Sequence, residues 1–288
     1  MNLSGLLAGF VDGLLIGFVY GVAAMGLTII FGVMDVINLA HGPLIAIGMF
    51  GVYELFTYLG MNPYLAIILV AIGGLIVGVI VYFSAVHRVI DAPPLSSLLS
   101  TFSVNMMIIG VGTAILSTSA YNVNFSLPSV SAGPITVTGN RIAAGLIAIL
   151  VTALLYVFLY RTRPGKYIRA VANNREAAEL MGIPSTRILA LAFGIGTMLA
   201  MTAGGLIATI LPINILAGGT YELKSFVIVV LGGLGNPLGA LIGGLILGLI
   251  EGLVPIFLKV TWVPVIEFGL FVLILLVMPQ GLFGKKDS

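Results

Sequence analysis

Long apolar segments follow one another along almost the whole chain, separated by short polar, glycine-rich or proline-rich breaks. A membrane-crossing α-helix needs ~20 mostly apolar residues. Segments near this length recur from end to end, and with two shorter ones they cover residues 6–31, 42–59, 64–86, 95–117, 142–160, 188–210, 226–234, 238–257 and 263–278. The pattern predicts an all-α integral membrane protein. We expect a polytopic helical bundle of about eight to nine spans that occupies residues 1–288 as a single transmembrane domain.

Interrupted or re-entrant helices are expected within this bundle. Segment 226–234 is about half a span at ~1.5 Å per residue. It therefore belongs to a broken or re-entrant helix, or to a helix that extends upstream through Tyr221. Counted as a crossing, it gives an odd number of spans, with the N-terminus outside and the C-terminus inside. A re-entrant segment would change that parity.

Glycine is concentrated at helical spacing in two of the apolar segments. One glycine in every four residues places small residues along one face of a helix, which lets two helix backbones approach closely in lipid. The glycines concerned are Gly5, Gly9, Gly13, Gly17 and Gly21 in the first segment and Gly244, Gly248 and Gly252 in the eighth. They predict a tightly packed bundle.

Composition and charge narrow the class of protein. The chain is 60% hydrophobic and 8% charged, against roughly a quarter charged in soluble domains, which excludes a soluble fold. Lys and Arg accumulate in cytoplasmic loops, and they are concentrated in segment 161–187 and at Lys285 and Lys286. Residues 1–87 contain neither, so the first apolar segment is expected to remain as a span. The absence of Cys excludes disulfides and thiolate metal sites.

A short helix is predicted within the basic segment. Asn173 and Glu176 have the spacing of a capping box, while Gly182 and Pro184 are typical of a helix end. The helix would cover residues 174–181 and place Ala177, Leu180 and Met181 on one face. An apolar ridge with charged flanks suits a partner's groove. The residues assigned to this contact are Arg175, Glu176, Ala177, Ala178, Leu180, Met181 and Gly182.

Ionisable and amide side chains within apolar segments are the candidates for a transport path. The ionisable ones are Asp12, Asp35, His41, Glu54, Glu251 and Glu267. Asn38 and Asn236 precede glycine-rich stretches in a faint internal echo, and paired interruptions of this kind point to a substrate path. The alternative for each Asn is a role that only satisfies its local backbone, and the alternative for His41 is a cap of the next helix. The candidate path comprises Asn38, His41, Gly42, Phe226, Gly232, Gly233 and Asn236.

Several stretches together resemble the permeases of branched-chain amino acid ABC importers. Glu176-Ala177-Ala178 with Gly182 is similar to the helix that couples ABC importer permeases to their ATPases. The wider resemblance covers segments 26–42, 161–196, 224–244 and 278–284. It implies a prokaryotic inner-membrane complex with a second, identical or homologous permease subunit, two ATPase subunits and an extracytoplasmic binding protein. It also implies a branched-chain amino acid as substrate, with urea or short amides as alternatives.

Motifs of other classes are absent from the sequence. The chain has no Gly-x-x-x-x-Gly-Lys-Ser/Thr phosphate loop, so ATP and Mg²⁺ are expected on the partner ATPases. No catalytic residue, metal site, cofactor or nucleic-acid contact is expected. The remaining alternative is an ion-coupled secondary transporter, for which Asp12, Asp35 or Glu251 would be the coupling carboxylate. That alternative gives the short helix in segment 161–187 no role.

Overall fold

The computed structural model describes residues 3–116, 118–132, 135–278 and 280–284. Within them the chain is helical apart from one small hairpin. The elements, in order, are α1 (Leu3–Met34), α2 (His41–Leu59), α3 (Pro63–Val81), the π-helix η1 (Tyr82–Val86), α4 (Pro94–Leu116), β1 (Val130–Ala132), β2 (Ile135–Val137), α5 (Gly139–Arg161), α6 (Arg163–Asn173), α7 (Arg175–Leu180), α8 (Ser185–Ala208), α9 (Ala217–Gly232), α10 (Pro237–Phe257) and α11 (Trp262–Val277).

The predicted all-α polytopic fold is confirmed. Within the described residues, 7 helices are long and apolar enough to cross a membrane, and α11 is a shorter apolar helix. The segment predicted as half a span is part of α9, which has 16 residues and extends upstream through Tyr221. The sequence pattern gave no sign of the antiparallel pair β1–β2.

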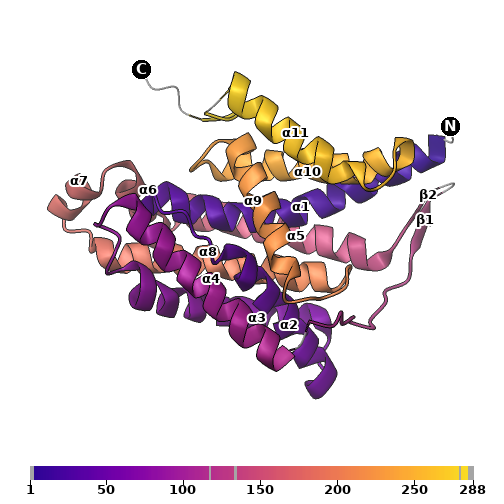
Figure 1. Cartoon of the computed structure of the whole chain (residues 1–288), viewed down its shortest axis with the longest axis horizontal. Coiled ribbons are helices and arrows are strands. Elements are labelled where there is room, and N and C mark those ends of the chain that lie inside the picture. The colour runs from indigo at the N-terminus through magenta and orange to yellow at the C-terminus, as the bar shows by residue number, and fades with distance from the viewer. Residues whose placement is uncertain (1–2, 117, 133–134, 279, 285–288) are drawn as a thin grey trace.

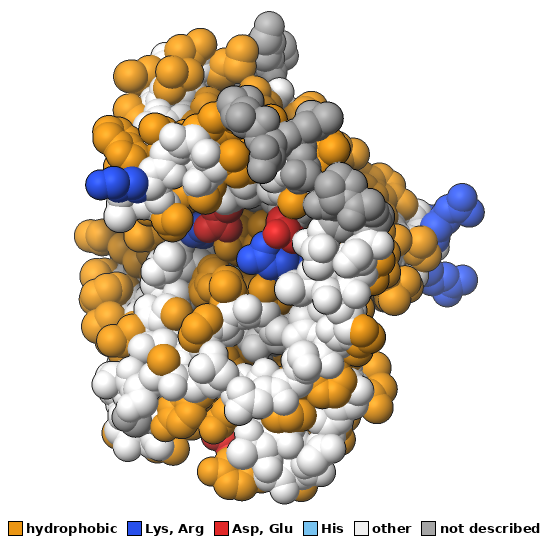
Figure 2. Space-filling model, turned by 90° about the vertical axis from the view of Figure 1, so that its right-hand side faces the viewer, with side chains coloured by type: hydrophobic (Ala, Val, Ile, Leu, Met, Phe, Trp, Pro, Cys, Tyr) orange, Lys and Arg blue, Asp and Glu red, His pale blue; other side chains and the backbone are white. Residues whose placement is uncertain are grey.

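The long helices lie side by side, and their ends define two ends of the bundle. Helices α6 and α7 lie at one, hereafter the α7 end, while the N-terminus and β1–β2 lie at the other, the hairpin end (Figure 1). Viewed from the hairpin end, hydrophobic side chains surround a recess in which acidic and basic side chains gather (Figure 2). An apolar outer surface with charges collected inward is what a bilayer requires.

Helices α1 and α10 touch backbone to backbone, as the predicted tight packing requires. A Cβ added to Gly13 would lie 2.7 Å from the carbonyl oxygen of Gly248, and one added to Gly17 would lie 2.9 Å from that of Gly244. The two glycine runs found in the sequence therefore face each other along an antiparallel pair. Where lipid replaces water, such close contact supplies the dispersion attraction that holds helices together.

The helix contacts repeat between the two halves of the chain. In one half α10 packs along α1, and in the other α3 packs along α8. Likewise, α11 contacts α9 and α10 in one half, and α4 contacts α2 and η1 in the other. Asn62 caps α3 and Asn236 caps α10, each followed by a proline, Pro63 or Pro237. Because α1 and α8 start at opposite ends, the halves form an inverted repeat (Figure 1). In this arrangement Asn236 corresponds in position to Asn62, the other Asn that caps a helix before a proline.

Replacing Gly13 with Val should destabilise the bundle, because the new side chain would strike the backbone of α10. Overpacking of this kind costs about 1–3 kcal/mol in well-packed interiors. Gly5→Val is the matched control, since a Cβ at Gly5 has nothing within 4 Å. We expect the midpoint of thermal unfolding in detergent to fall for Gly13→Val and to stay near wild type for Gly5→Val. Equal midpoints for the two variants would contradict the backbone contact.

Candidate functional sites: the short helix α7 and a polar cluster between broken helices

Local capping fixes both ends of α7. The Asn174 side chain accepts a hydrogen bond from the Ala177 amide (2.9 Å), and Gly182 adopts a left-handed φ of 80°. The Ile183 amide then donates to the Ala178 carbonyl at 3.0 Å, which closes a Schellman motif. The predicted helix end is confirmed. The predicted capping box is wrong, because Asn173 is the last residue of α6 and its side chain bonds back to Arg169 at 3.0 Å.

The three residues Ala177, Leu180 and Met181, hereafter the apolar ridge, face solvent. Leu180 is 89% exposed and Met181 83%, whereas Ala178 is 5% exposed and packs inward. Helix α7 lies at the tip of its end of the molecule (Figure 1). A rigidly capped helix with exposed large apolar side chains is suited to insertion into a groove on another protein.

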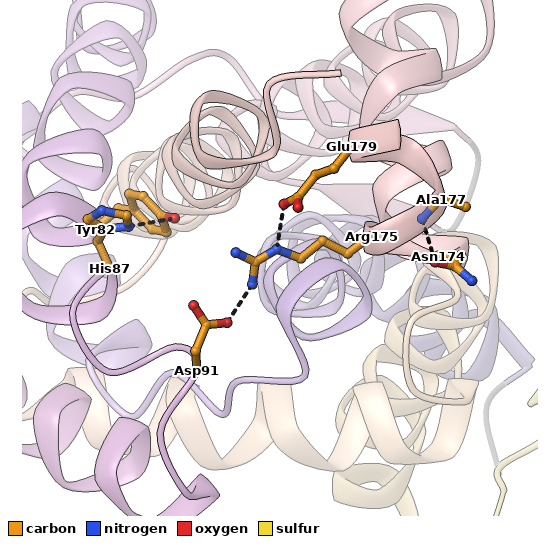
Figure 3. A network of polar contacts seen from close by, with 7 residues as sticks. All are labelled: Tyr82, His87, Asp91, Asn174, Arg175, Ala177 and Glu179. Atoms are coloured by element: carbon orange, nitrogen blue, oxygen red, sulfur yellow. Dashed lines mark hydrogen bonds and ion pairs between the residues drawn. The ribbon is translucent and has the colours of Figure 1, made fainter. Parts of the chain in front are cut away.

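An ion pair joins α7 to the loop between α3 and α4. Arg175 Nη1 lies 2.7 Å from Asp91 Oδ1, and Arg175 Nε lies 3.2 Å from Glu179 Oε1 (Figure 3). Burial alone would lower the pKa of the Arg175 guanidinium, but the hydrogen bond and charge of Asp91, followed by those of Glu179, raise it. Arg175 therefore stays charged and holds α7 against this loop.

The last turn of α3 is wound as the π-helix η1 beside this ion pair. Tyr82, the first residue of η1, is fully buried and packs on Phe193 of α8, with ring centroids 6.3 Å apart. Its hydroxyl lies 3.4 Å from Nδ1 of His87 (Figure 3). The end of α3, the body of α8 and the loop that contacts α7 thus lie close together at Tyr82 and His87. A π-helical turn at such a junction is common at functional sites.

A second feature lies inside the bundle, where the chain turns back after α1. His41, the first residue of α2, places Nε2 3.0 Å from the carbonyl oxygen of Ala23, in the body of α1. Asn38 Oδ1 accepts from the Ala40 amide at 3.1 Å. Both Asn38 and His41 are 0% exposed. Helix α2 therefore begins within the bundle and is one of the predicted interrupted helices.

Polar side chains of α4 hold this returning segment. Thr101 donates to the Ile37 carbonyl at 3.0 Å and accepts from the Leu39 amide at 3.3 Å. The amide of Asn105 donates to the Leu39 carbonyl and lies 3.4 Å from Glu222 Oε2. Hydrogen bonds from α4 thus replace the ladder that the broken helix lacks.

The first turns of α2 and α9 meet at this point. A Cβ added to Gly218 of α9 would lie 2.5 Å from the Gly42 carbonyl oxygen, and one added to Gly42 would lie 2.7 Å from Glu222 Oε2. The two positive helix ends are therefore close together, and a carboxylate beside them offsets their repulsion. Asn38, His41, Thr101, Asn105 and Glu222 are hereafter the central polar cluster.

The central polar cluster has hydrogen-bonding capacity to spare. Asn38 Nδ2, His41 Nδ1 and Asn105 Oδ1 are buried and have no partner among the residues that the structure describes. Buried polar groups within a membrane domain destabilise the fold unless they have hydrogen-bond partners. The cluster is thus a candidate site for groups that enter from outside the chain.

Comparison with known proteins identifies the family. Residues 9–278 match the family model described as the permease component of branched-chain amino acid transport systems. The chain belongs to this permease family.

Individual relatives agree with this assignment. The permease is 31% identical to the high-affinity branched-chain amino acid transport system permease protein LivH of Escherichia coli K12, over 96% of this chain and 94% of that one. It is 30% identical to BraD of Pseudomonas aeruginosa, over 96% and 95%. A fructose import permease of Bifidobacterium longum is 28% identical over 74% of this chain and 59% of its own. No solved structure matches.

The structure divides the candidate path of the permease into two groups. Gly42 joins Asn38 and His41 at the cluster. Gly232, Gly233 and Asn236 lie at the α9–α10 turn, ~20 Å away along α9, with Phe226 half-buried between the two groups. Asn236 caps α10 by accepting from Leu238 and Gly239 amides at 3.1 and 3.2 Å. The local backbone role weighed for both Asn residues is thus observed.

Sequence reasoning missed Thr101, Asn105 and Glu222. Glu222 was overlooked because the apolar segment was cut at Phe226, although extension of its helix through Tyr221 places Glu222 one turn upstream on the same helix. Thr101 and Asn105 are uncharged and lie within an apolar span. Their only signal is that polar residues inside a span need a partner.

The other ionisable candidates are mostly paired. Asp12 lies 2.8 Å from Arg141. Lys224 of α9 contacts Glu251 and lies 3.3 Å from Glu267, whose side chain is 2% exposed. These ion pairs join α1 to α5 and α9 to α10 and α11. Two of the three proposed ion-coupling carboxylates, Asp12 and Glu251, therefore have structural partners.

Asn105→Leu should destabilise the permease, because it removes the side-chain amide that donates to the Leu39 carbonyl and to the Glu222 carboxylate. Such losses cost about 1–3 kcal/mol. Ser103→Leu is the control, since Ser103 is exposed on the same helix and bonds only to the Leu99 carbonyl. Thermal unfolding in detergent should show a lower midpoint for Asn105→Leu alone. An unchanged midpoint would mean that α4 does not hold the returning segment.

Proposed function

We propose that this chain is the membrane-spanning permease subunit of a prokaryotic inner-membrane ABC importer for branched-chain amino acids. In this proposal an extracytoplasmic binding protein delivers the substrate, a second permease subunit completes the path, and two ATPase subunits bind ATP and Mg²⁺ and drive transport. The observation that carries the proposal is α7, whose apolar ridge is exposed at the tip of the bundle and whose base is tied to the membrane helices by Arg175 and Asp91.

The α7 end is proposed to face the cytoplasm. It carries the basic segment 161–187, and positive residues concentrate on that side of the membrane. The N-terminus then lies outside and the C-terminus inside. This orientation presents the apolar ridge to cytoplasmic ATPases and the hairpin end to an extracytoplasmic binding protein.

Coupling is proposed to run from α7 to the central polar cluster. Movement of α7 by the ATPases would pull Asp91 through Arg175, and Asp91 lies in the loop that leads into α4. Helix α4 in turn holds residues 37–39 through Thr101 and Asn105. A shift of α4 would therefore displace the start of α2 against α9 and switch access to the path.

The central polar cluster is proposed to line the path at that junction. An amino acid carries an ammonium and a carboxylate group, for which Glu222 and the starts of α2 and α9 offer complementary partners. Substrate choice is proposed to rest largely on the binding protein. An ion-driven mechanism is less well supported, because Asp12 and Glu251 are paired with Arg141 and Lys224.

Met181→Asp should detach the ATPase subunits, because a charge would have to be buried in an apolar groove. We expect co-purification of the ATPases in detergent to fall at least tenfold, in line with a loss of more than about 1.4 kcal/mol of binding free energy. Tyr58→Asp adds the same charge to a side chain that is 76% exposed at the opposite end and should leave co-purification intact. Retention of the ATPases by both variants would show that the ridge does not dock them.

Arg175→Gln and Asp91→Asn should impair transport through one shared interaction. As a partly exposed ion pair, it contributes only about 0–1 kcal/mol to stability, so both variants should fold. ATP-dependent uptake in proteoliposomes should fall several-fold in each single variant, and the double variant should lose no more than either. Arg187→Gln, at an exposed nearby Arg, serves as control. Additive losses in the double variant would indicate that the residues act separately.

A further inference from the structure

A cavity lies at the α7 end, apart from the central polar cluster. It has a volume of about 620 Å³ and is bordered by α1, α5, α6, the α9–α10 turn and residues 280–284. This volume is within the usual range for small-molecule sites of about 300–1,000 Å³. Asp35 and Asn173 on its wall are exposed, so the cavity is reached from outside the bundle.

Two charged side chains line the cavity, one acidic and one basic, and neither has an ion-pair partner among the described residues. Asp35 has no hydrogen bond or ion pair from its carboxylate within the described residues, and its backbone has a φ of 53°. Arg169 uses Nε to bind the Leu159 carbonyl at 3.1 Å and lies 4.4 Å from the centre of the Tyr160 ring. Its two terminal nitrogens have no partner among those residues. A positioned guanidinium binds carboxylates, and a free carboxylate attracts an ammonium group.

Further wall residues complete the match to an amino acid with an aliphatic side chain. Apolar side chains occupy much of the remaining wall. They include Ile29, Phe31, Val33, Ile168, Leu234 and Phe283.

We propose that this cavity binds a branched-chain amino acid from the cytoplasm, and that the imported product thereby slows its own import. The inference rests on the proposed function for its substrate class and for the cytoplasmic orientation. The aliphatic side chain would lie on the apolar wall, its ammonium at Asp35 and its carboxylate at Arg169. One ligand would then bridge α6 to the segment that follows α1.

A ligand that bridges α6 to the segment after α1 would restrain α7. Arg169 belongs to α6, which leads directly into α7 through Asn174. Asp35 follows α1, whose glycine contacts fix it to α10. A bound amino acid therefore ties the base of α7 to the least movable pair of helices and opposes the movement that the ATPases drive.

Direct binding is the first test. Radiolabelled leucine should bind the full-length permease in nanodiscs, and 4-methylpentanoate, which lacks the ammonium group, should not compete. Asp35→Asn keeps the size and tolerates the positive φ, yet removes the charge, so affinity should fall about tenfold or more. Lys259→Gln instead removes an exposed charge from the loop after α10 and should bind as wild type. Absence of binding, or equal affinity in wild type and Asp35→Asn, overturns the proposal.

Transport tests the regulatory consequence. Proteoliposomes with the complete transporter, ATP inside and leucine-loaded binding protein outside are compared with and without leucine in the lumen. The ratio of the two initial rates should show several-fold slowing for wild type and Lys259→Gln and little for Asp35→Asn. Equal slowing in Asp35→Asn would place the inhibition elsewhere. Failure of all uptake from an empty lumen would refute the proposed importer. The leucine-binding measurement would still show whether the cavity binds an amino acid.

Discussion

The close contact of α1 with α10, in which glycine backbones meet over successive turns, is the constraint on which the other features depend. Gly13 and Gly17 lie directly against the backbone of α10. On the other side of the inverted repeat, Gly78 brings α3 equally close to α8, with an added Cβ 2.8 Å from the Cα of Gly194. In lipid, contacts of this kind replace the hydrophobic effect as the source of stability. They give the bundle a frame that tolerates broken helices within it.

Helices α2 and α9 begin inside the bundle that these close helix pairs enclose. Each helix starts inside the protein, so its first amide groups and its positive dipole end need partners that lipid cannot supply. The structure supplies Asn38, Thr101, Asn105 and Glu222 at this point. The same groups that satisfy the broken helices form a polar junction at membrane depth. The junction is linked through α4 to the loop that Arg175 of α7 binds, so the α7 end and the centre of the bundle are mechanically connected.

Much of this could be predicted from the sequence, and the failures have physical causes. Apolar length identified the spans, and Gly182 with Pro184 located the end of α7, because both signals are local. The start of α7 was misplaced by one residue because two adjacent Asn residues compete for the cap, and only the extended backbone of Asn174 decides between them. Which helix packs against the glycine run of α1 is set by tertiary packing, so the sequence pattern alone does not show it. Glu222 and Asn105 meet from positions 117 residues apart, which no periodicity in one chain reveals.

We propose that ATP hydrolysis on separate subunits drives amino acid import through this chain. It is tested most directly by the initial rate of labelled leucine uptake into proteoliposomes that contain the permease with its candidate partner permease, ATPase and binding-protein chains. We expect uptake that requires enclosed ATP and external binding protein, and that persists when proton and sodium gradients are collapsed. Uptake driven by an imposed proton or sodium gradient without any ATPase would contradict it.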